Sequence, residues 1–501
     1  MPAYAPASLS LGRRGLAELR WRAAASLFAA SSPGFYSVQS GCRITDICGF
    51  DGCSSGMSRT VRCTTNRPRP IAFMGCERDA RPMTTGLNRR RGAGIALMLS
   101  ISAAAVMLTA ASTDPDDETV YRERFATLMK NGGVILKYEP MEPLPGASTA
   151  RPLPVVAKGR NTISPKALDA AVDYAAKMNS TALIVWRNGR IEREAYFKGR
   201  DARSQLVSKS LSKPLTAIAV GHAIQLGKIK SLDQPVADFI TEWRGTPKAT
   251  ILVRHLLDMR AGLMEQMVSS DPDHPVNRAY ISPNLAPALI AYPLTSKPGE
   301  KYGYGNATAE LVALLIERAT GERYADFVGK RILAAVGAPG GEIWVSKPGG
   351  LAHSGCCMTL PAESFLRLGI LLANDGMAGG KRLLPRGYVA QMATGTAANP
   401  HYGLGVWVAG PYVQRRGFAA PDKPGPKVLH SQPYADRDLI LFDGNSNQTV
   451  FISRAARTVV LRMGDNPPQQ PEWDNSVLPN LILNGIDWKR GETRPLPQPA
   501  N

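Results

Sequence analysis

Apolar and polar positions divide the chain into a first strand-bearing part, a helical middle and a second strand-bearing part. Ser164 and Pro165 are typical of a helix start, and the apolar spacing predicts a helix over 166–178. Two apolar, β-branched runs follow at 181–186 and 191–197, joined by an Asn-Gly turn. The pattern therefore predicts a helix packed on an antiparallel hairpin.

From about 211 to 390 the apolar spacing is mainly helical. Strand-like segments return near the C-terminus, in the runs 403–408, 438–442, 449–453 and 458–463, and a short helix is expected at 478–483. Strands before and after a helical stretch predict an α+β fold, in which a helical region is inserted into a sheet domain. We expect this domain to span 112–490, followed by a short tail, 491–501.

Charge and composition argue against nucleic acid as a partner. The chain has 501 residues and a formal net charge of +19, of which residues 1–82 and the run Arg89-Arg90-Arg91 carry +9. In the remainder, lysines and arginines alternate with acids and form no basic stripe. A solvated, mixed surface is the expected result.

Residues 83–111 have the features of a secretory signal peptide. The arginine run is followed by an apolar stretch over 92–108 and then by small residues. Because 82 residues without a sustained pattern precede it, we interpret 1–82 as untranslated upstream sequence or as disordered. Cleavage near Ser112 predicts a periplasmic or secreted protein, and retention of the segment as a membrane anchor is the alternative.

Cysteine and histidine positions predict neither a disulfide framework nor a metal site. Only Cys356 and Cys357 lie in the body of the chain, and as neighbours they are expected to remain thiols. The six histidines lack metal-ligand spacing. We expect the protein to work without a metal or an organic cofactor.

One Ser-x-x-Lys motif, Ser210 to Lys213, stands where the helical part begins. At the start of a helix, this spacing places the hydroxyl and the amine on one face. A serine hydroxyl needs a base, and a lysine serves as one when its surroundings favour the free amine. Tyr304 and Asn306 form the one Tyr-x-Asn motif of the chain, and a tyrosine in the same pocket completes a proton relay.

Around these motifs the chain resembles the serine β-lactamase and penicillin-binding protein superfamily over about residues 165–465. The similar branch contains class C β-lactamases, esterases and 6-aminohexanoate-dimer hydrolase. Five segments match in the family's order: 207–213 around the serine, 251–263, 298–306 around the tyrosine, 365–369 and 402–405. The resemblance implies an α/β/α sandwich of the β-lactamase/transpeptidase type.

The resemblance also implies roles for the motif residues. Ser210 would attack a carbonyl carbon, Lys213 and Tyr304 would move its proton, and Asn306 would orient the substrate or the lysine. The family's third motif, Lys-Thr-Gly or His-x-Gly, corresponds best to Phe442-Asp443-Gly444-Asn445. The Asn445 and Ser210 N–H groups would then form the oxyanion hole, but the motif's leading cation is missing.

The predicted function is therefore that of an exported serine hydrolase which cleaves an ester or amide bond through an acyl-serine, and its expected partner is a small-molecule ester, amide or lactam substrate. Two alternatives stay open: a β-lactamase or D,D-peptidase, and a penicillin-binding sensor protein that is acylated but turns over slowly. The acyl and leaving groups depend on the loops 265–280 and 415–433, where no motif gives guidance.

Overall fold

The computed structural model describes residues 115–500, apart from 150, 268, 420 and 422. The predicted segments 1–82 and 83–111 lie outside the described residues. The helices are α2 (Pro115–Lys130), α3 (Pro165–Lys177), α4 (Ser212–Gln225), α5 (Val253–Leu257), α6 (Pro275–Ile281), α7 (Leu285–Ala291), α8 (Asn306–Thr320), α9 (Tyr324–Val328), α10 (Ala362–Ala373), α11 (Tyr388–Met392) and α12 (Val477–Asn484).

Strands fall in both halves of the chain. They are β1 (Met141–Leu144), β2 (Ser180–Arg187), β3 (Arg190–Tyr196), β4 (Leu206–Val207), β5 (Gly341–Trp344), β6 (Met358–Leu360), β7 (Met377–Ala378), β8 (Lys381–Arg382), β9 (Trp407–Val408), β10 (Arg415–Gly417), β11 (Lys427–Leu429), β12 (Ile440–Gly444), β13 (Gln448–Ser453) and β14 (Thr458–Gly464).

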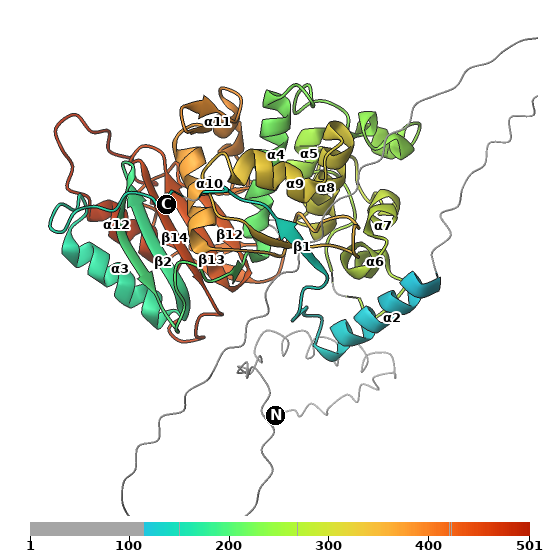
Figure 1. The fold of residues 1–501 in the computed structure, drawn as a ribbon, viewed down its shortest axis with the longest axis horizontal. Helices are drawn as coiled ribbons and strands as arrows, with labels where there is room; N and C mark the ends of the chain where they lie inside the picture. The colour runs from blue at the N-terminus through green and yellow to red at the C-terminus, as the bar shows by residue number, and fades with distance from the viewer. Residues whose placement is uncertain (1–114, 150, 268, 420, 422, 501) are drawn as a thin grey trace, which may run out of the picture. The chain divides into compact units, whose positions relative to one another are not determined.

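The central layer is a six-stranded antiparallel sheet in the order β3-β2-β14-β13-β12-β9. The first hairpin therefore pairs with strands more than 250 positions later, since Leu461 faces Ile184 across the ladder. This arrangement confirms the predicted α+β fold, with helices on both sides of an antiparallel sheet (Figure 1).

Strand pleating sends alternate residues of the sheet into two separate cores. Ile440, Phe442 and Val450 belong to the core shared with the helical region, and α10 packs on that face. Leu441 and Phe451 point to the opposite core, which α3 and α12 cover. Strands β2, β12 and β13 are buried on both faces, so packing on both sides fixes their register.

A second, four-stranded sheet in the order β1-β5-β6-β4 joins the helical region to the residues before it. The sequence predicted the interval 211–390 as mainly helical, and the short strands β5 to β8 inside it were missed. They have two to four residues; β5 and β6 take partners from distant segments, and β7 and β8 form a hairpin of two residues a side, so local periodicity carries little signal for them.

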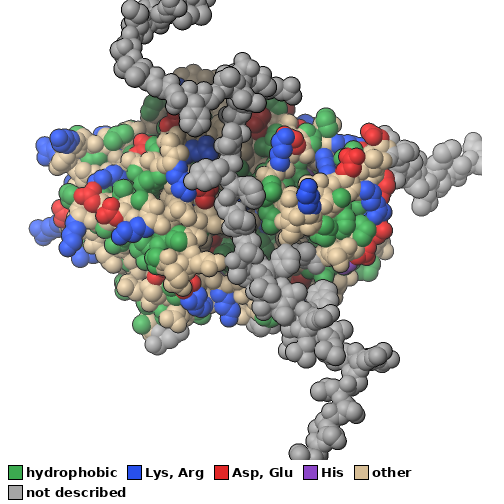
Figure 2. Space-filling view, turned by 90° about the horizontal axis from the view of Figure 1, so that it is seen from below, with side chains coloured by type: hydrophobic (Ala, Val, Ile, Leu, Met, Phe, Trp, Pro, Cys, Tyr) green, Lys and Arg blue, Asp and Glu red, His purple; other side chains and the backbone are tan. Residues whose placement is uncertain are grey.

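The surface of the described residues mixes charges of both signs. Figure 2 shows Lys/Arg and Asp/Glu side chains interspersed over one face, and many pair with each other, as Arg193 does with Asp169 at 2.7 Å. Within the part of the chain that the structure describes, no helix is long and apolar enough to cross a membrane.

Replacing Gly369 with valine should destabilise the protein. A Cβ atom at this position of α10 would lie 2.9 Å from Cγ1 of both Val450 and Val459, so the helix would have to move off the sheet. We expect a loss of about 1–3 kcal/mol in the free energy of unfolding, measured by urea denaturation. Gly417→Val is the control, because nothing lies within 4 Å of its added Cβ; equal losses for the two variants would contradict the packing argument.

Candidate active site

Ser210 lies in a short 3-10 turn, Lys209–Leu211, that leads directly into α4. Lys209 adopts the left-handed conformation, with φ of 49°, which bends the chain sharply out of β4. Ser208 fixes this bend from the other side: its N–H donates to the Met358 carbonyl at 2.8 Å, and its hydroxyl accepts from the Met358 N–H at 3.1 Å. The turn that carries Ser210 is therefore attached to β6.

Lys213 follows one helical turn later, with only 2% of its surface exposed. Its Nζ lies 3.1 Å from Ser210 Oγ, 2.8 Å from Asn306 Oδ1 and 2.8 Å from the Gly355 carbonyl oxygen. An ammonium group has three hydrogens, so three acceptors use its whole donor capacity. The amine is held at a single point against the serine hydroxyl.

Tyr304 and Asn306 reach the lysine from the loop that precedes α8. The loop is attached to the segment 251–263, because Gly303 N–H donates to the Met259 carbonyl at 2.8 Å. The Lys213 amine lies 4.9 Å from the centroid of the Tyr304 ring. Among the described residues, no hydrogen bond joins the Tyr304 hydroxyl to the serine or the lysine.

Two aromatic rings contact Tyr304, and Tyr302 packs against one of them, Tyr402. Trp407 stacks on Tyr304 at 6.0 Å between centroids, and Tyr402 meets both rings edge-on. Burial raises the pKa of the Tyr302 and Tyr402 hydroxyls well above the usual value, so neither loses its proton near neutral pH. Tyr304 is less buried than these two and is the tyrosine that faces the lysine.

The predicted third motif lies against the nucleophile turn. Gly444, at the end of β12, comes so close that a Cβ atom there would lie 3.1 Å from both the Ser210 and the Leu211 backbone nitrogens. Asn445 follows directly and is exposed to solvent. The structure thus brings Ser210, Lys213, Asn306 and Gly444 together, with Tyr304 and Asn445 beside them.

Strand alternation sends the other two motif residues away from the nucleophile. Phe442 is fully buried in the core shared with the helical region. Asp443 points to the opposite face, where its carboxylate forms a buried ion pair with Arg416 of the β10–β11 hairpin. Burial raises the pKa of Asp443, and the Arg416 charge opposes that effect. Arg437, a candidate replacement for the missing cation, is half-exposed beside Asp438.

The two loops expected to shape the substrate site contact each other. Lys423 of the 415–433 loop forms an ion pair with Glu265 of the 265–280 loop. The neighbouring Gln266 accepts a hydrogen bond from Asn306 N–H through Oε1, at 3.0 Å. Both loops are therefore tied to the residues around Lys213, as expected for segments that shape a substrate pocket.

The expectation that Cys356 and Cys357 remain thiols was wrong, because the structure joins them in a disulfide. Cys357 has φ of 73°, and this local turn brings the neighbouring side chains together. The sequence predicted no metal site. The described residues contain no group of three or more His, Cys, Asp or Glu side chains suited to hold a metal ion.

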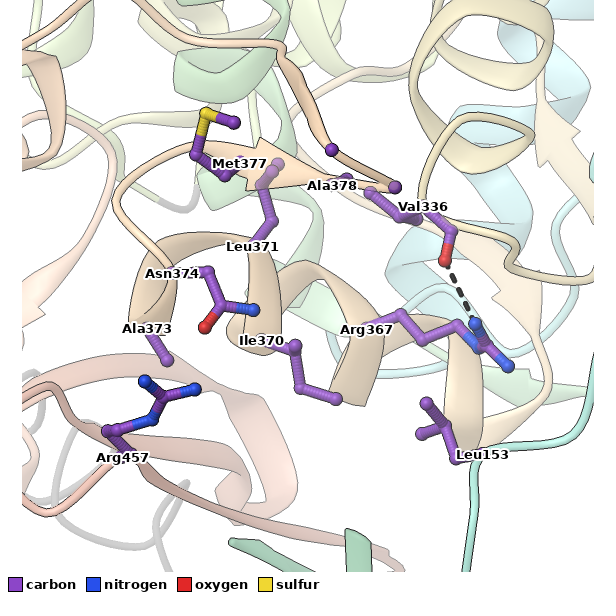
Figure 3. Close-up of a pocket in the computed structure, with 12 residues that line it drawn as sticks. Leu153, Val336, Arg367, Ile370, Leu371, Ala373, Asn374, Met377, Ala378 and Arg457 are labelled. Carbon is purple, nitrogen blue, oxygen red and sulfur yellow. Dashed lines mark hydrogen bonds between the residues drawn. The ribbon is translucent and has the colours of Figure 1, made fainter. Parts of the chain in front are cut away.

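A surface pocket of about 510 Å³ lies elsewhere, along α10 and the turn that follows it (Figure 3). Leu153, Val336 and Ile370 line it, with Arg367 at one end and Arg457 at the other. Arg367 belongs to the matched segment 365–369, but none of the predicted catalytic, substrate-binding or oxyanion-hole residues lines this pocket. It is therefore separate from the site around Ser210.

Sequence reasoning missed the groups that complete the site from distant segments. The Gly355 carbonyl leaves no sequence signal, because every residue has one. Arg416 lies in a hairpin without a motif. Lys209 donates to the Tyr138 hydroxyl at 2.9 Å, and Tyr138 lies outside the residues that resemble the family.

Comparison with known proteins then identifies the family. A model of the Beta-lactamase family matches residues 168–463, more than half of the chain. The chain belongs to the beta-lactamase family. This assignment confirms the resemblance seen in the motifs and makes the chain a homologue of serine hydrolases.

Individual relatives agree with this assignment. The chain is 27% identical to the 6-aminohexanoate-dimer hydrolase of Paenarthrobacter ureafaciens over 226 residues, which cover 43% of this chain and 57% of that protein. A solved structure from Bacillus anthracis, assigned as a 6-aminohexanoate-dimer hydrolase, has the same fold, with a TM-score of 0.54 and 19% identity over 74% of this chain and 94% of the other. A Bacteroides dorei structure assigned as a beta-lactamase gives a TM-score of 0.52 and 16% identity over 65% of this chain and 100% of the other.

Replacing Arg416 with methionine should strongly destabilise the fold by leaving Asp443 buried without its cation. We expect a loss of about 3–5 kcal/mol at pH 7, measured by chemical denaturation. The loss should shrink as the pH falls toward about 4, because burial raises the pKa of Asp443 and its protonation removes the uncompensated charge. The double variant Arg416→Met, Asp443→Leu should recover much of the stability; a double variant no better than the single one would refute this account.

Proposed function

We propose that the protein hydrolyses an ester or amide bond of a small-molecule substrate through an acyl-serine intermediate on Ser210. The observation that carries this proposal is the position of Lys213 Nζ, within hydrogen-bonding distance of Ser210 Oγ, Asn306 Oδ1 and the Gly355 carbonyl. Family membership supports hydrolysis as the reaction class.

The geometry suits Lys213 as the general base. A neutral amine has two N–H donors and one lone pair. Asn306 Oδ1 and the Gly355 carbonyl are acceptors only at these contacts, so they take the two N–H groups and leave the lone pair directed at the serine. The Ser210 hydroxyl then donates its hydrogen bond to Nζ, and its proton passes there as the oxygen attacks.

The remaining steps use groups in the same place. The tetrahedral oxyanion is stabilised by backbone N–H donors, for which we assign Ser210 and Asn445, because Gly444 lies against the nucleophile turn. Collapse of this intermediate requires a proton for the leaving group. Tyr304 is next to the protonated lysine and passes the proton on, and water later hydrolyses the acyl-serine with the same base.

The surroundings of β12 favour substrates other than β-lactams. Relatives that cleave these anionic substrates are expected to hold the carboxylate with the cation that leads the third motif. Here Phe442 faces the core and the Asp443 charge is neutralised by Arg416. The β-lactamase or D,D-peptidase alternative and the slowly deacylating sensor alternative are therefore less favoured, because neither explains the absence of this cation.

Export is part of the proposal. It rests on the arginine run and the apolar stretch of residues 83–111, and it implies a periplasmic or secreted enzyme. Retention of that segment would instead anchor the enzyme at a membrane. N-terminal sequencing of the protein from its host distinguishes a chain that begins near Ser112 from one that retains the segment.

Removing the nucleophile or its base should abolish turnover without unfolding the protein. We expect Ser210→Ala to lose essentially all hydrolysis of a p-nitrophenyl ester. Lys213→Ala and Tyr304→Phe should each lower kcat by two or more orders of magnitude, and their effects should not add, because they serve one proton relay. Pre-steady-state kinetics should show a burst followed by turnover. Retained activity in Ser210→Ala would disprove the assignment, and labelling without turnover would favour the sensor alternative.

The wild-type enzyme should have a higher kcat/KM for a short-chain p-nitrophenyl ester than for a chromogenic cephalosporin. Loss of one charge-assisted contact to the cephalosporin carboxylate is worth roughly 1.5–3 kcal/mol, or about one to two orders of magnitude in affinity. Phe442→Lys should fail to raise cephalosporin hydrolysis, because position 442 faces the core. A preference for the cephalosporin would overturn the substrate class and leave the nucleophile assignment intact.

A further inference from the structure

A fully buried carboxylate lies one helical turn beyond Asn306. Glu310 is 0% exposed in α8, and none of the proton transfers described above uses it. Burying an ionised carboxylate costs several kcal/mol unless other groups hydrogen-bond to it. Its contacts indicate what it contributes to the site.

Glu310 is joined to the lysine through a single residue. Its Oε2 accepts a hydrogen bond from the Gly355 N–H at 3.1 Å. The carbonyl of the same Gly355 accepts from Lys213 Nζ at 2.8 Å. Helix α8 therefore holds the lysine twice, directly through Asn306 and indirectly through Glu310 and Gly355.

Only a glycine backbone fits at position 355. An added Cβ atom would lie 2.7 Å from Ala309 Cβ and 3.3 Å from Glu310 Oε1. The segment thus lies directly on α8, where a small movement of the backbone changes the direction of the carbonyl group. The carboxylate that anchors the N–H group of Gly355 limits that movement.

The far side of the carboxylate is closed by a buried imidazole. Glu310 Oε1 lies 3.5 Å from His353 Nδ1, and His353 is 0% exposed. The imidazole stacks on Trp344 with centroids 3.5 Å apart and an angle of 9° between the rings. Glu310 is therefore confined between His353 and Gly355, which favours a single orientation of its side chain.

We propose that Glu310 is a positioning residue for the general base. By holding Gly355, it aims the carbonyl that takes one N–H of Lys213, so that the lysine lone pair meets the Ser210 hydroxyl. This role rests on the proposed function of Ser210 and Lys213. It differs from a purely structural role because it acts on the reactivity of Ser210 rather than on the fraction of folded enzyme.

The test is the second-order rate constant for labelling of Ser210 by a fluorophosphonate, together with the number of labels per chain at completion. Glu310→Leu should slow labelling about 10- to 100-fold, because misdirection of a catalytic group by about 1 Å has effects of this size. The stoichiometry should still reach one label per chain. A merely structural role would lower the stoichiometry and leave the rate constant unchanged.

Two conservative variants separate position from charge and remain informative if Glu310→Leu does not fold. Glu310→Gln keeps a carbonyl oxygen within reach of the Gly355 N–H and should label within about threefold of the wild-type rate. Glu310→Asp keeps the charge but withdraws the oxygen by one methylene, and should label as slowly as the leucine variant. Slow labelling of Glu310→Gln combined with normal labelling of Glu310→Asp would overturn the proposal.

Glu192→Leu is the matched control. Glu192 is also a buried carboxylate, but it lies on β3 and accepts hydrogen bonds from Asn161 and Thr162. Its loss should lower the unfolding temperature without changing the labelling rate. If the wild-type enzyme were labelled at a residue other than Ser210, the proposed function would fail; if Ser210 were labelled equally fast in wild type and Glu310→Leu, only the positioning role would fail.

Discussion

Three acceptors around one buried amine set the geometry on which the site depends. Lys213 Nζ meets the serine of the preceding 3-10 turn, the Asn306 amide at the start of α8 and a carbonyl from the segment before β6. These groups lie between 3 and 142 positions away along the chain. Folding has to bring α4, α8 and this segment to within hydrogen-bonding distance of one atom, so an error in the packing of any of them disturbs the base.

Glycines make this convergence sterically possible. Gly355 lies on α8, Gly444 lies on the nucleophile turn, and Gly405 approaches the Lys213 carbonyl so closely that a Cβ atom would be 3.0 Å from it. Each is a place where backbone rather than a side chain contacts the nucleophile helix or its partner. Gly405 and Gly444 lie in segments that correspond to family motifs, so these segments serve close backbone packing as well as chemistry.

Much of this arrangement could be predicted from the sequence because it depends on local patterns. The spacing of Ser210 and Lys213, the Asn-Gly turn of the first hairpin and the apolar, β-branched runs of β12 to β14 can each be read directly from neighbouring residues. The pairing of Arg416 with Asp443, the disulfide at Cys356 and the Gly355 carbonyl could not be predicted in this way. The ion pair and the carbonyl contact depend on which distant backbones meet, and the disulfide depends on the positive φ of Cys357; no local sequence pattern encodes either.

Pleating also explains why a motif residue at the expected position need not act in the site. Phe442 and Asp443 are neighbours in the chain, yet the Phe442 side chain packs in the core under α10. The Asp443 carboxylate instead pairs with Arg416, which lies over the Trp407 ring. A change of substrate charge preference therefore requires a cation introduced from a loop, since the strand positions already serve packing and ion pairing.

The folded unit extends beyond the residues that define the family. Before the matched interval, α2 packs on α6 and Tyr138 reaches Lys209 beside the nucleophile. After it, the Gln498 side chain donates to the Gly410 carbonyl at 2.8 Å, next to the edge strand β9. The Gln498 N–H donates to the Tyr434 carbonyl, and the Tyr434 N–H donates to Gln498 Oε1. A chain truncated to the residues that match the family would lose the contacts made by α2, Tyr138 and Gln498. The boundaries of the smallest independently folding unit therefore have to be set by its contacts rather than by homology.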